Sequence, residues 1–139
     1  MNGLEINTDK NRLDLHFIHG FISNSYWGKD RTIDAMQMCI DNSLNFGVYL
    51  SDKQIGYARV VTDYAQFAYI MDVFIDENHR DKGYSVALMK FIMECEALKN
   101  IKVWRLATAD AHGLYKKFGF EALEKPENLM ELIIKNRLK

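Results

Sequence analysis

The sequence predicts a mixed α/β or α+β fold, in which helices pack on a single sheet. Two features indicate this fold. Residues 46–63 and 67–75 alternate apolar and polar side chains in runs that polar turns separate, which is typical of an antiparallel meander. An apolar helical pattern over 83–98 then precedes a strand-like run over 102–108, and a strand–helix–strand succession implies a parallel crossover.

Two elements are expected before the meander. The run "LDLHFI" (13–18) alternates well enough for a strand, and residues 31–44 place apolar side chains at helical spacing. The polar loop "SNSYWGKD" (23–30) joins them and contains two aromatic residues. Within the meander, the first two strands are expected to turn at 51–54.

Two further elements are expected after the crossover. The stretch "DAHGLYKKFG" (110–119) predicts a helix with Asp110 as N-cap and Gly119 as C-terminal stop, and "LMELIIK" (129–135) predicts a late strand. Residues 1–139 are expected to form one domain, because the only proline is Pro126 and no glycine-rich linker or repeat occurs.

Composition excludes several classes of protein. The formal charge of −1 gives no overall basic field of the kind that dominates nucleic-acid affinity. The first residues include acids where a signal peptide has a basic start, and no apolar run is long enough to span a membrane. Cys39 and Cys95 fit reduced core thiols, and the histidines show no metal-ligand spacing. A soluble cytoplasmic protein without a metal is therefore expected.

The stretch Arg80-Asp81-Lys82-Gly83-Tyr84-Ser85 leads from the third meander strand into the helix over 83–98. A helix start offers unpaired backbone N–H groups and the positive end of the helix dipole, which together favour phosphate. Arg80 and Lys82 add positive charge, and Gly83 allows close approach of the backbone. The chain contains neither GxxxxGK(S/T) nor GxGxxG, so two familiar phosphate loops are excluded.

This loop and a second segment, "LYKKFGF" (114–120), follow each other in the order and spacing of two family motifs. The first is similar to a pyrophosphate loop of the pattern Q/R-x-x-G-x-G/A, and the second to a helix end of the pattern L/F-Y-x-K-x-G-F. Together they resemble the GNAT superfamily of acetyl-CoA-dependent N-acetyltransferases. The order of elements also matches, so the resemblance spans nearly the whole chain.

The resemblance implies one GNAT-like domain with a mostly antiparallel mixed sheet, helices on both faces, and a parallel pair of strands that splay apart in the middle. It also implies acetyl-CoA as cosubstrate and no metal. The pyrophosphate is expected on the loop 80–85. The pantetheine arm is expected on the backbone of Val73, Phe74 and Ile75.

Two positions depart from the family pattern. Ser85 stands where the family has glycine or alanine, and we expect cofactor binding to survive its extra hydroxyl. Thr108, with Asp110 two residues on, stands where many members have an asparagine that contacts the pantetheine. We include Thr108 and Asp110 among the candidate cofactor contacts.

Acetyl transfer to an amine needs a base that takes a proton from an ammonium and an acid that protonates the leaving thiolate. The resemblance implies Tyr115 as the acid, and a core tyrosine on an apolar stripe is the alternative. Asp72 is the candidate base or amine anchor, because a carboxylate inside the apolar run "AYIMDVFI" needs a compensating interaction. Its alternative is a structural ion pair with Arg59 on the neighbouring strand.

Most candidate acceptor contacts lie in or next to the loop before the helix over 31–44. Tyr26 and Trp27 are candidates for an aromatic wall, with simple packing as the alternative. Arg31 is a candidate contact for a substrate carboxylate, and Arg59 of the meander is a further candidate substrate contact. The expected acceptor is a primary amine of a small molecule, because the domain is compact. The alternatives are a protein or peptide N-acetyltransferase and a non-catalytic acyl-CoA-binding module. The sequence leaves open whether two copies of the chain form a homodimer.

Overall fold

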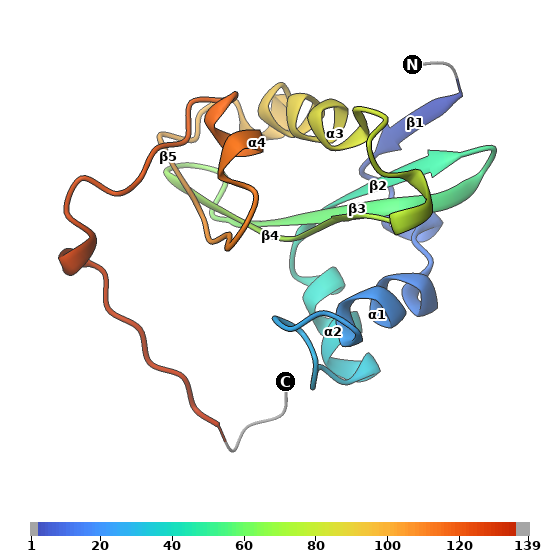
Figure 1. Cartoon of the computed structure of the whole chain (residues 1–139), viewed down its shortest axis with the longest axis horizontal. Coiled ribbons are helices and arrows are strands. Elements are labelled where there is room, and N and C mark those ends of the chain that lie inside the picture. Colours follow the sequence, from blue (N-terminus) through green and yellow to red (C-terminus); the bar gives the residue numbers. More distant parts are fainter. Residues whose placement is uncertain (1–2, 136–139) are drawn as a thin grey trace.

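The computed structural model describes residues 3–135, and its centre is one five-stranded sheet (Figure 1). The strands are β1 (Leu4–Asn7), β2 (Leu44–Leu50), β3 (Lys53–Thr62), β4 (Phe67–Ile75) and β5 (Val103–Leu106). They lie in the order β1-β2-β3-β4-β5, and every neighbouring pair is antiparallel except β4 and β5, which are parallel. The predicted mixed, mostly antiparallel sheet with a parallel crossover is confirmed.

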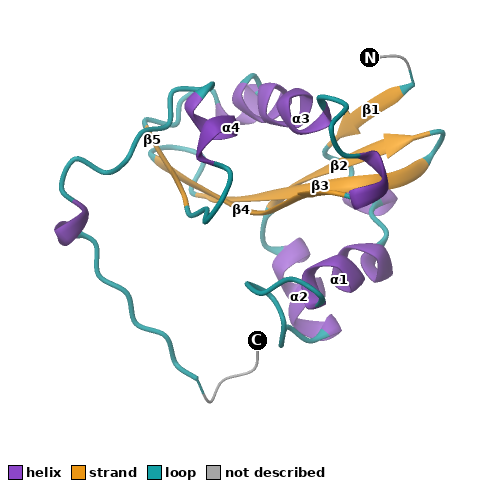
Figure 2. Cartoon of the chain, in the orientation of Figure 1, coloured by secondary structure: helices purple, strands orange, loops and turns teal. Residues whose placement is uncertain are grey.

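Helices cover both faces of this sheet (Figure 2). The helices α1 (Leu15–Ser23) and α2 (Ile33–Asp41) pack on one face, and α3 (Tyr84–Met93) and α4 (His112–Lys116) on the other. Each face has its own apolar core. The core on the α1–α2 side contains buried residues of both helices with Tyr57 and Phe74 of the sheet, whereas the larger core lies under α3.

The meander forms as the alternation predicts. β4 spans the expected residues 67–75, and β2 and β3 join through Ser51 and Asp52, whose φ angles are 49° and 65°. Positive φ at both central residues is typical of a type I′ hairpin turn, whose twist matches that of the strands. The turn is therefore shorter than the expected 51–54, and β3 begins at Lys53.

The predicted strand over 13–18 is wrong, because most of these residues belong to α1. Asp14 caps this helix by accepting a hydrogen bond from the backbone N–H of Phe17 at 3.0 Å. Ile18 and Ile22, four residues apart, are fully buried against the sheet. The short alternation in "LDLHFI" is thus the beginning of a helical stripe that continues past residue 18.

Other elements are shorter than expected. α2 begins after its cap Thr32 and ends at Asp41, so Leu44 of the expected helix over 31–44 starts β2 instead. α3 ends at Met93, and β5 covers only the middle of the expected strand over 102–108. Single 3-10 turns lie at Lys10–Arg12, Glu77–His79, Glu96–Leu98 and Pro126–Asn128.

Both ends of the described chain differ from expectation. The structure adds β1, which pairs with β2 and was not predicted. The predicted strand over 129–135 is wrong, because this segment is extended but pairs with no strand among residues 3–135. The parallel pair β4–β5 consequently lies at one end of the described sheet and not in its middle.

Candidate active site

The open edge of β4 is the first feature of the candidate site. The parallel pairing with β5 runs only from Phe67 opposite Val103 to Ile70 opposite Leu106. β4 continues to Ile75, so its residues 71–75 have no strand partner on the β5 side within the described chain. Backbone N–H and C=O groups along such an edge are free to pair with an extended ligand.

A bulge at Asp72 interrupts β4 next to this edge. Arg59 of β3 lies opposite Met71, and Tyr57 opposite Phe74, so Asp72 and Val73 together face the single residue between them on β3. Asp72 has a φ of 57°, a conformation that aspartate tolerates better than most residues. The extra residue turns the Asp72 side chain towards α1 and α2, away from the core under α3.

The central cavity is a hollow of about 460 Å³ that opens where β4 and the chain after β5 diverge. Residues from the α1–α2 loop, β4, the end of β5 and α4 line it. They are Tyr26, Trp27, Arg31, Tyr69, Ile70, Met71, Asp72, Val73, Leu106, Ala107, Thr108, Ala109, Asp110, Ala111 and Tyr115. The cavity thus brings together both predicted catalytic residues and three of the four predicted acceptor contacts.

The helix-start cavity is a second hollow, of about 420 Å³, at the N-terminus of α3. Its lining contains most of the predicted pyrophosphate loop, and consists of Ile75, His79, Arg80, Asp81, Gly83, Tyr84, Ser85, Val86 and Lys117. Gly83 occupies the N-cap position with a φ of 80°, which glycine adopts without steric cost. The ten-residue helix behind it directs its first backbone N–H groups towards this cavity.

β4 connects the two cavities. Val73 lines the central cavity and Ile75, two residues further along the same edge, lines the helix-start cavity. The side chain of Phe74, between them, points to the opposite face and stacks on Phe21 with ring centroids 3.9 Å apart. Only the backbone of Phe74 is therefore placed for the predicted contact.

Tyr115 projects from α4 into the wall of the central cavity. Its side chain is 8% exposed and packs edge-on against Phe120, with ring centroids 6.1 Å apart. Burial raises the pKa of the Tyr115 phenol above its usual value, and the negative charge of Asp110 raises it further. The phenol therefore stays protonated at neutral pH, as an acid must.

Asp72 lies between two arginines. Its Oδ2 accepts a hydrogen bond from Nε of Arg59 at 2.5 Å and another from Nη1 of Arg31 at 2.7 Å. The Asp72 side chain is 2% exposed, and Arg59 also donates to the hydroxyl of Ser43. Burial alone would lower the pKa of Arg59, but the charge of Asp72 and its hydrogen bond together raise it. The Asp72–Arg59 ion pair considered from the sequence is thus present, and Arg31 completes a triad.

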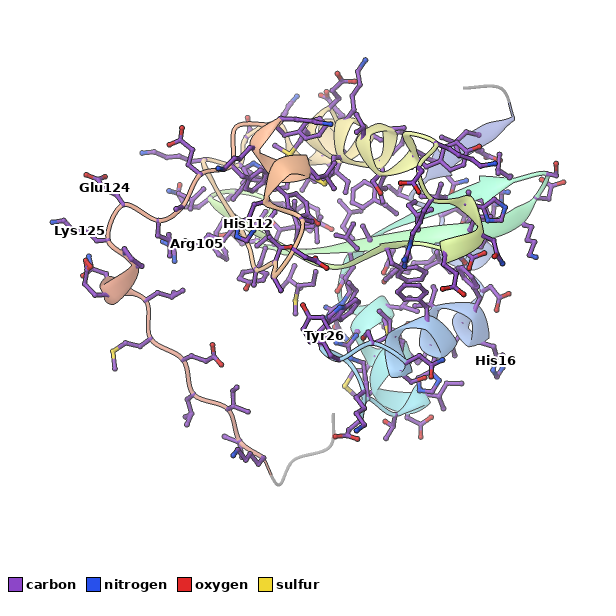
Figure 3. All side chains as sticks on the ribbon, viewed as in Figure 1. His16, Tyr26, Arg105, His112, Glu124 and Lys125 are labelled. Atoms are coloured by element: carbon purple, nitrogen blue, oxygen red, sulfur yellow. The ribbon has the colours of Figure 1, made fainter. Side chains whose placement is uncertain are left out.

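The loop between α1 and α2 carries the aromatic side of the cavity. Tyr26, which is labelled in Figure 3, is 74% exposed, and Trp27 is 41% exposed. Both residues line the central cavity. Gly28 follows them in the chain. A Cβ added at Gly28 would lie 2.9 Å from the backbone oxygen of Ile22. The absence of a side chain at Gly28 lets the loop fold tightly onto the end of α1.

Three predicted residues have roles or places that differ from expectation. Asp110 is not the N-cap of α4, because that helix begins one residue later than a cap at 110 requires, with Ala111 at the cap position. Thr108 shapes the turn instead, since its hydroxyl accepts a hydrogen bond from the N–H of Ala111 at 3.0 Å. Lys82 is exposed and lies outside the lining of the helix-start cavity. Contact of these residues with a cofactor stays a prediction.

Some lining residues had not been selected from the sequence. Tyr69 and Met71 come from β4 itself, where an alternating strand gives no sign of which residues border an open edge. Lys117 reaches the helix-start cavity from the end of α4. The motif "LYKKFGF" contains this lysine, and its positive charge was the available signal.

Comparison with known proteins decides the family. Residues 41–122 match the family described as the acetyltransferase (GNAT) domain. The chain belongs to the GNAT family. A crystal structure from Xanthomonas campestris pv. campestris, of a protein assigned to the same family of acetyltransferases, is 41% identical to this GNAT chain. The match covers 96% of this chain and 95% of the other, with a TM-score of 0.92.

Two more distant relatives extend the comparison. A protein of Gibberella zeae named as an acetyltransferase is 23% identical over 133 residues, which is 81% of this GNAT chain and 75% of the relative. A structure from Clostridium acetobutylicum, solved with acetyl-CoA, has the same fold at 14% identity and a TM-score of 0.66, covering 96% of this chain and 98% of that one.

Metal and membrane features were also sought. Within residues 3–135 of this GNAT protein, no group of three or more His, Cys, Asp or Glu side chains is arranged to hold a metal ion. None of the described helices is both long enough and apolar enough to cross a bilayer.

Proposed function

We propose that this GNAT acetyltransferase transfers an acetyl group from acetyl-CoA directly to the primary amine of a small molecule. The observation that carries the proposal is the open edge of β4, which leads from the helix-start cavity at Ile75 to the central cavity at Val73. Residues 71–75 of an extended strand span about 13 Å. A pantetheine arm that pairs with this backbone has one end beside α3 and the other beside Tyr115.

The helix-start cavity suits the pyrophosphate end of such a ligand. Gly83 leaves the backbone uncovered at the N-terminus of α3, where N–H groups and the helix dipole favour an anion. Arg80 and Lys117 border the same hollow and add positive charge from two different elements. These groups bind and orient, and the acetyl thioester supplies the group that is transferred.

Gly83→Val is expected to weaken CoA binding at least tenfold, which corresponds to about 1.4 kcal/mol or more. A β-branched residue is strained at a φ of 80° and its methyl groups cover the backbone that faces the phosphates. Calorimetric titration with CoA measures the effect. Gly20→Val is the matched control, because a Cβ at Gly20 meets nothing within 4 Å. Equal CoA affinity in the two folded variants would remove the pyrophosphate assignment.

The central cavity supports a small acceptor. Its volume of about 460 Å³ is that of a site for a small molecule, and Tyr26 and Trp27 border it as aromatic side chains. The phenol of Tyr115 borders the same cavity, so an amine held there lies beside the acid that we assign to the leaving thiolate.

The arginines beside the cavity indicate where a carboxylate fits. Arg31 and Arg59 carry two positive charges against the single carboxylate of Asp72, so this triad is itself net positive. Asp110 adds a negative charge elsewhere in the lining. Arg31 lines the cavity and directs only Nη1 to Asp72, so its other nitrogens remain as donors for an acceptor. We therefore propose an acceptor that carries a carboxylate near its amine.

The acceptor assignment is tested with pairs of amines that differ only in charge, such as an amino acid and its amide. CoA release with the carboxylate form is expected to have at least a tenfold higher kcat/KM, the size of one charged hydrogen bond. Arg31→Gln is expected to abolish this preference, whereas Lys29→Gln, an exposed residue of the same loop, leaves it unchanged. Equal rates for both forms would contradict the proposal that the acceptor carries a carboxylate. Activity confined to peptide substrates would contradict the proposal of a small-molecule acceptor.

A further inference from the structure

The end of the loop between α1 and α2 is tied to α1 by a histidine. Nε2 of His19, on α1, lies 2.9 Å from the backbone carbonyl oxygen of Arg31, twelve positions further along the chain. A carbonyl oxygen can only accept a hydrogen bond, so the His19 ring carries a proton on Nε2 and donates it. His19 is partly buried, and the surrounding protein strengthens such a bond relative to one in water. α1 therefore holds the backbone of Arg31 directly.

A different set of hydrogen bonds anchors the beginning of this loop. The backbone N–H of Ser25 donates to the carbonyl of Ile22 in α1 at 3.0 Å, and the Ser25 hydroxyl donates to the same carbonyl at 2.6 Å. Next to α2 the loop has an internal turn, in which the N–H of Arg31 donates to the carbonyl of Gly28 at 3.0 Å. Within residues 3–135, no hydrogen bond other than that of His19 connects Arg31 to α1. His19 is thus the polar contact that fixes Arg31 relative to this helix.

The side chain of Arg31 extends from this fixed backbone to the charged triad. Its Nη1 donates to Oδ2 of Asp72 at 2.7 Å and lies 3.5 Å from Sδ of Met36. Arg31 is therefore held at two points, the backbone oxygen and Nη1, while its other guanidinium nitrogens stay available at the central cavity. Donors that are held in place before a ligand binds lose less conformational entropy when it binds.

We propose that His19 is a positioning residue, which holds Arg31 in the orientation that binds the acceptor carboxylate. The inference rests on the proposed function, in which Arg31 contacts that carboxylate. His19 is not in the lining of the central cavity, so it acts through Arg31 and not by touching the acceptor. Without the His19 donor, the end of the loop is released and the Arg31 nitrogens lose their fixed place. This loss weakens carboxylate binding and leaves the chemistry at the amine unchanged.

The first test is steady-state kinetics with two probes, the amino acid that gives the fastest CoA release and its amide. His19→Leu removes the donor at similar side-chain size, and is expected to raise the KM of the amino acid about fivefold or more with kcat within about twofold. The KM of the amide should stay within about twofold of the wild type. His19→Gln places an amide N–H at the same number of bonds from Cβ as Nε2 of histidine, so it should restore the KM of the amino acid. His16→Leu, at an exposed position of the same helix, is the matched control (Figure 3).

Each contrary result has a distinct meaning. A His19→Leu variant with an unchanged KM for the amino acid, or with an equal increase for the amide, would overturn the positioning role. A His19→Gln variant that behaves like His19→Leu would overturn it as well. A wild type that shows no preference for the amino acid over its amide would overturn the carboxylate assignment of the proposed function, and this inference with it.

The second test is nuclear magnetic resonance of the wild-type chain, so it does not depend on the folding of a variant. At a pH of about 8, where free imidazole is neutral, long-range ¹H–¹⁵N spectra show which ring nitrogen carries the proton. We expect the proton of His19 on Nε2. With CoA bound, addition of the amino acid is expected to shift the His19 Nε2 signal more than addition of its amide, because only the carboxylate binds to Arg31. A ring protonated on Nδ1, or equal shifts with both probes, would contradict the positioning role.

Discussion

Tyr115→Phe is expected to lower the turnover of acetyl transfer by about 10²–10⁴-fold, the usual range for the loss of an acid–base catalyst. The variant removes only the hydroxyl that borders the central cavity, and the ring keeps its edge-on contact with Phe120. No hydrogen bond to this hydroxyl occurs within residues 3–135, so its removal leaves no described group unpaired. The free energy of unfolding should therefore change little.

The measurement combines CoA release at saturating substrates with thermal unfolding of the same preparation. Because the pKa of Tyr115 is raised, the acid form is present at every pH below about 10 and is lost only above it. The Tyr115→Phe defect should consequently be equally large from neutral pH up to that value. Tyr64→Phe is the control, since Tyr64 is half exposed in the turn between β3 and β4. Turnover within twofold of the wild type would make Tyr115 a core residue.

Asp72→Asn is expected to lower the free energy of unfolding by about 3–5 kcal/mol, the cost of removing one partner from a buried ion pair. Asparagine has the shape of aspartate and tolerates the positive φ at this position. The measured loss of stability therefore reports the removal of the charge alone. Without the carboxylate, Arg31 and Arg59 lie close together and lose the negative charge that both contact, and their side chains are only 13% and 8% exposed.

Urea denaturation measures this loss, with Asp76→Asn as the matched control. Asp76 pairs with His79 at 3.2 Å, but both side chains are about a quarter exposed, so the control should change stability by no more than about 1 kcal/mol. A role of Asp72 as the catalytic base predicts a different result. If Asp72 is the base, the folded variant loses about 10²-fold or more in turnover and the acid limb of its pH–rate profile, while its stability matches the control.

Much of the architecture follows from local sequence patterns. The meander was predictable because its strands alternate and short turns join them, and the cofactor loop because a glycine, two cations and a helix start lie within six residues. The sequence also marked Asp72 as unusual, because a carboxylate in an apolar strand needs a compensating interaction, and an ion pair was one of the two roles that this left open. Arg59, on the neighbouring strand, was the partner within reach of that reasoning.

The rest depends on contacts between distant segments. Arg31 meets Asp72 from 41 positions away, because the loop after α1 folds under the sheet, and no local pattern encodes that approach. The bulge at Asp72 depends on the register between two strands, which alternation alone does not determine. The segment 129–135 has the composition of a strand, yet it pairs with no strand among residues 3–135, because strand formation needs a neighbour that local composition does not supply.

The bulge has a consequence for how the site is organised. Without Asp72, Val73 would stand opposite Ala58, and Val73, Phe74 and Ile75 would keep the faces they have now, so the ladder would be regular. A single additional residue in β4 therefore accounts for two properties together. It adds the carboxylate that organises the arginines, and it bends the strand where its edge opens. One extra residue in β4 thus couples the placement of the charged triad to the opening of the edge on which the pantetheine arm is proposed to pair.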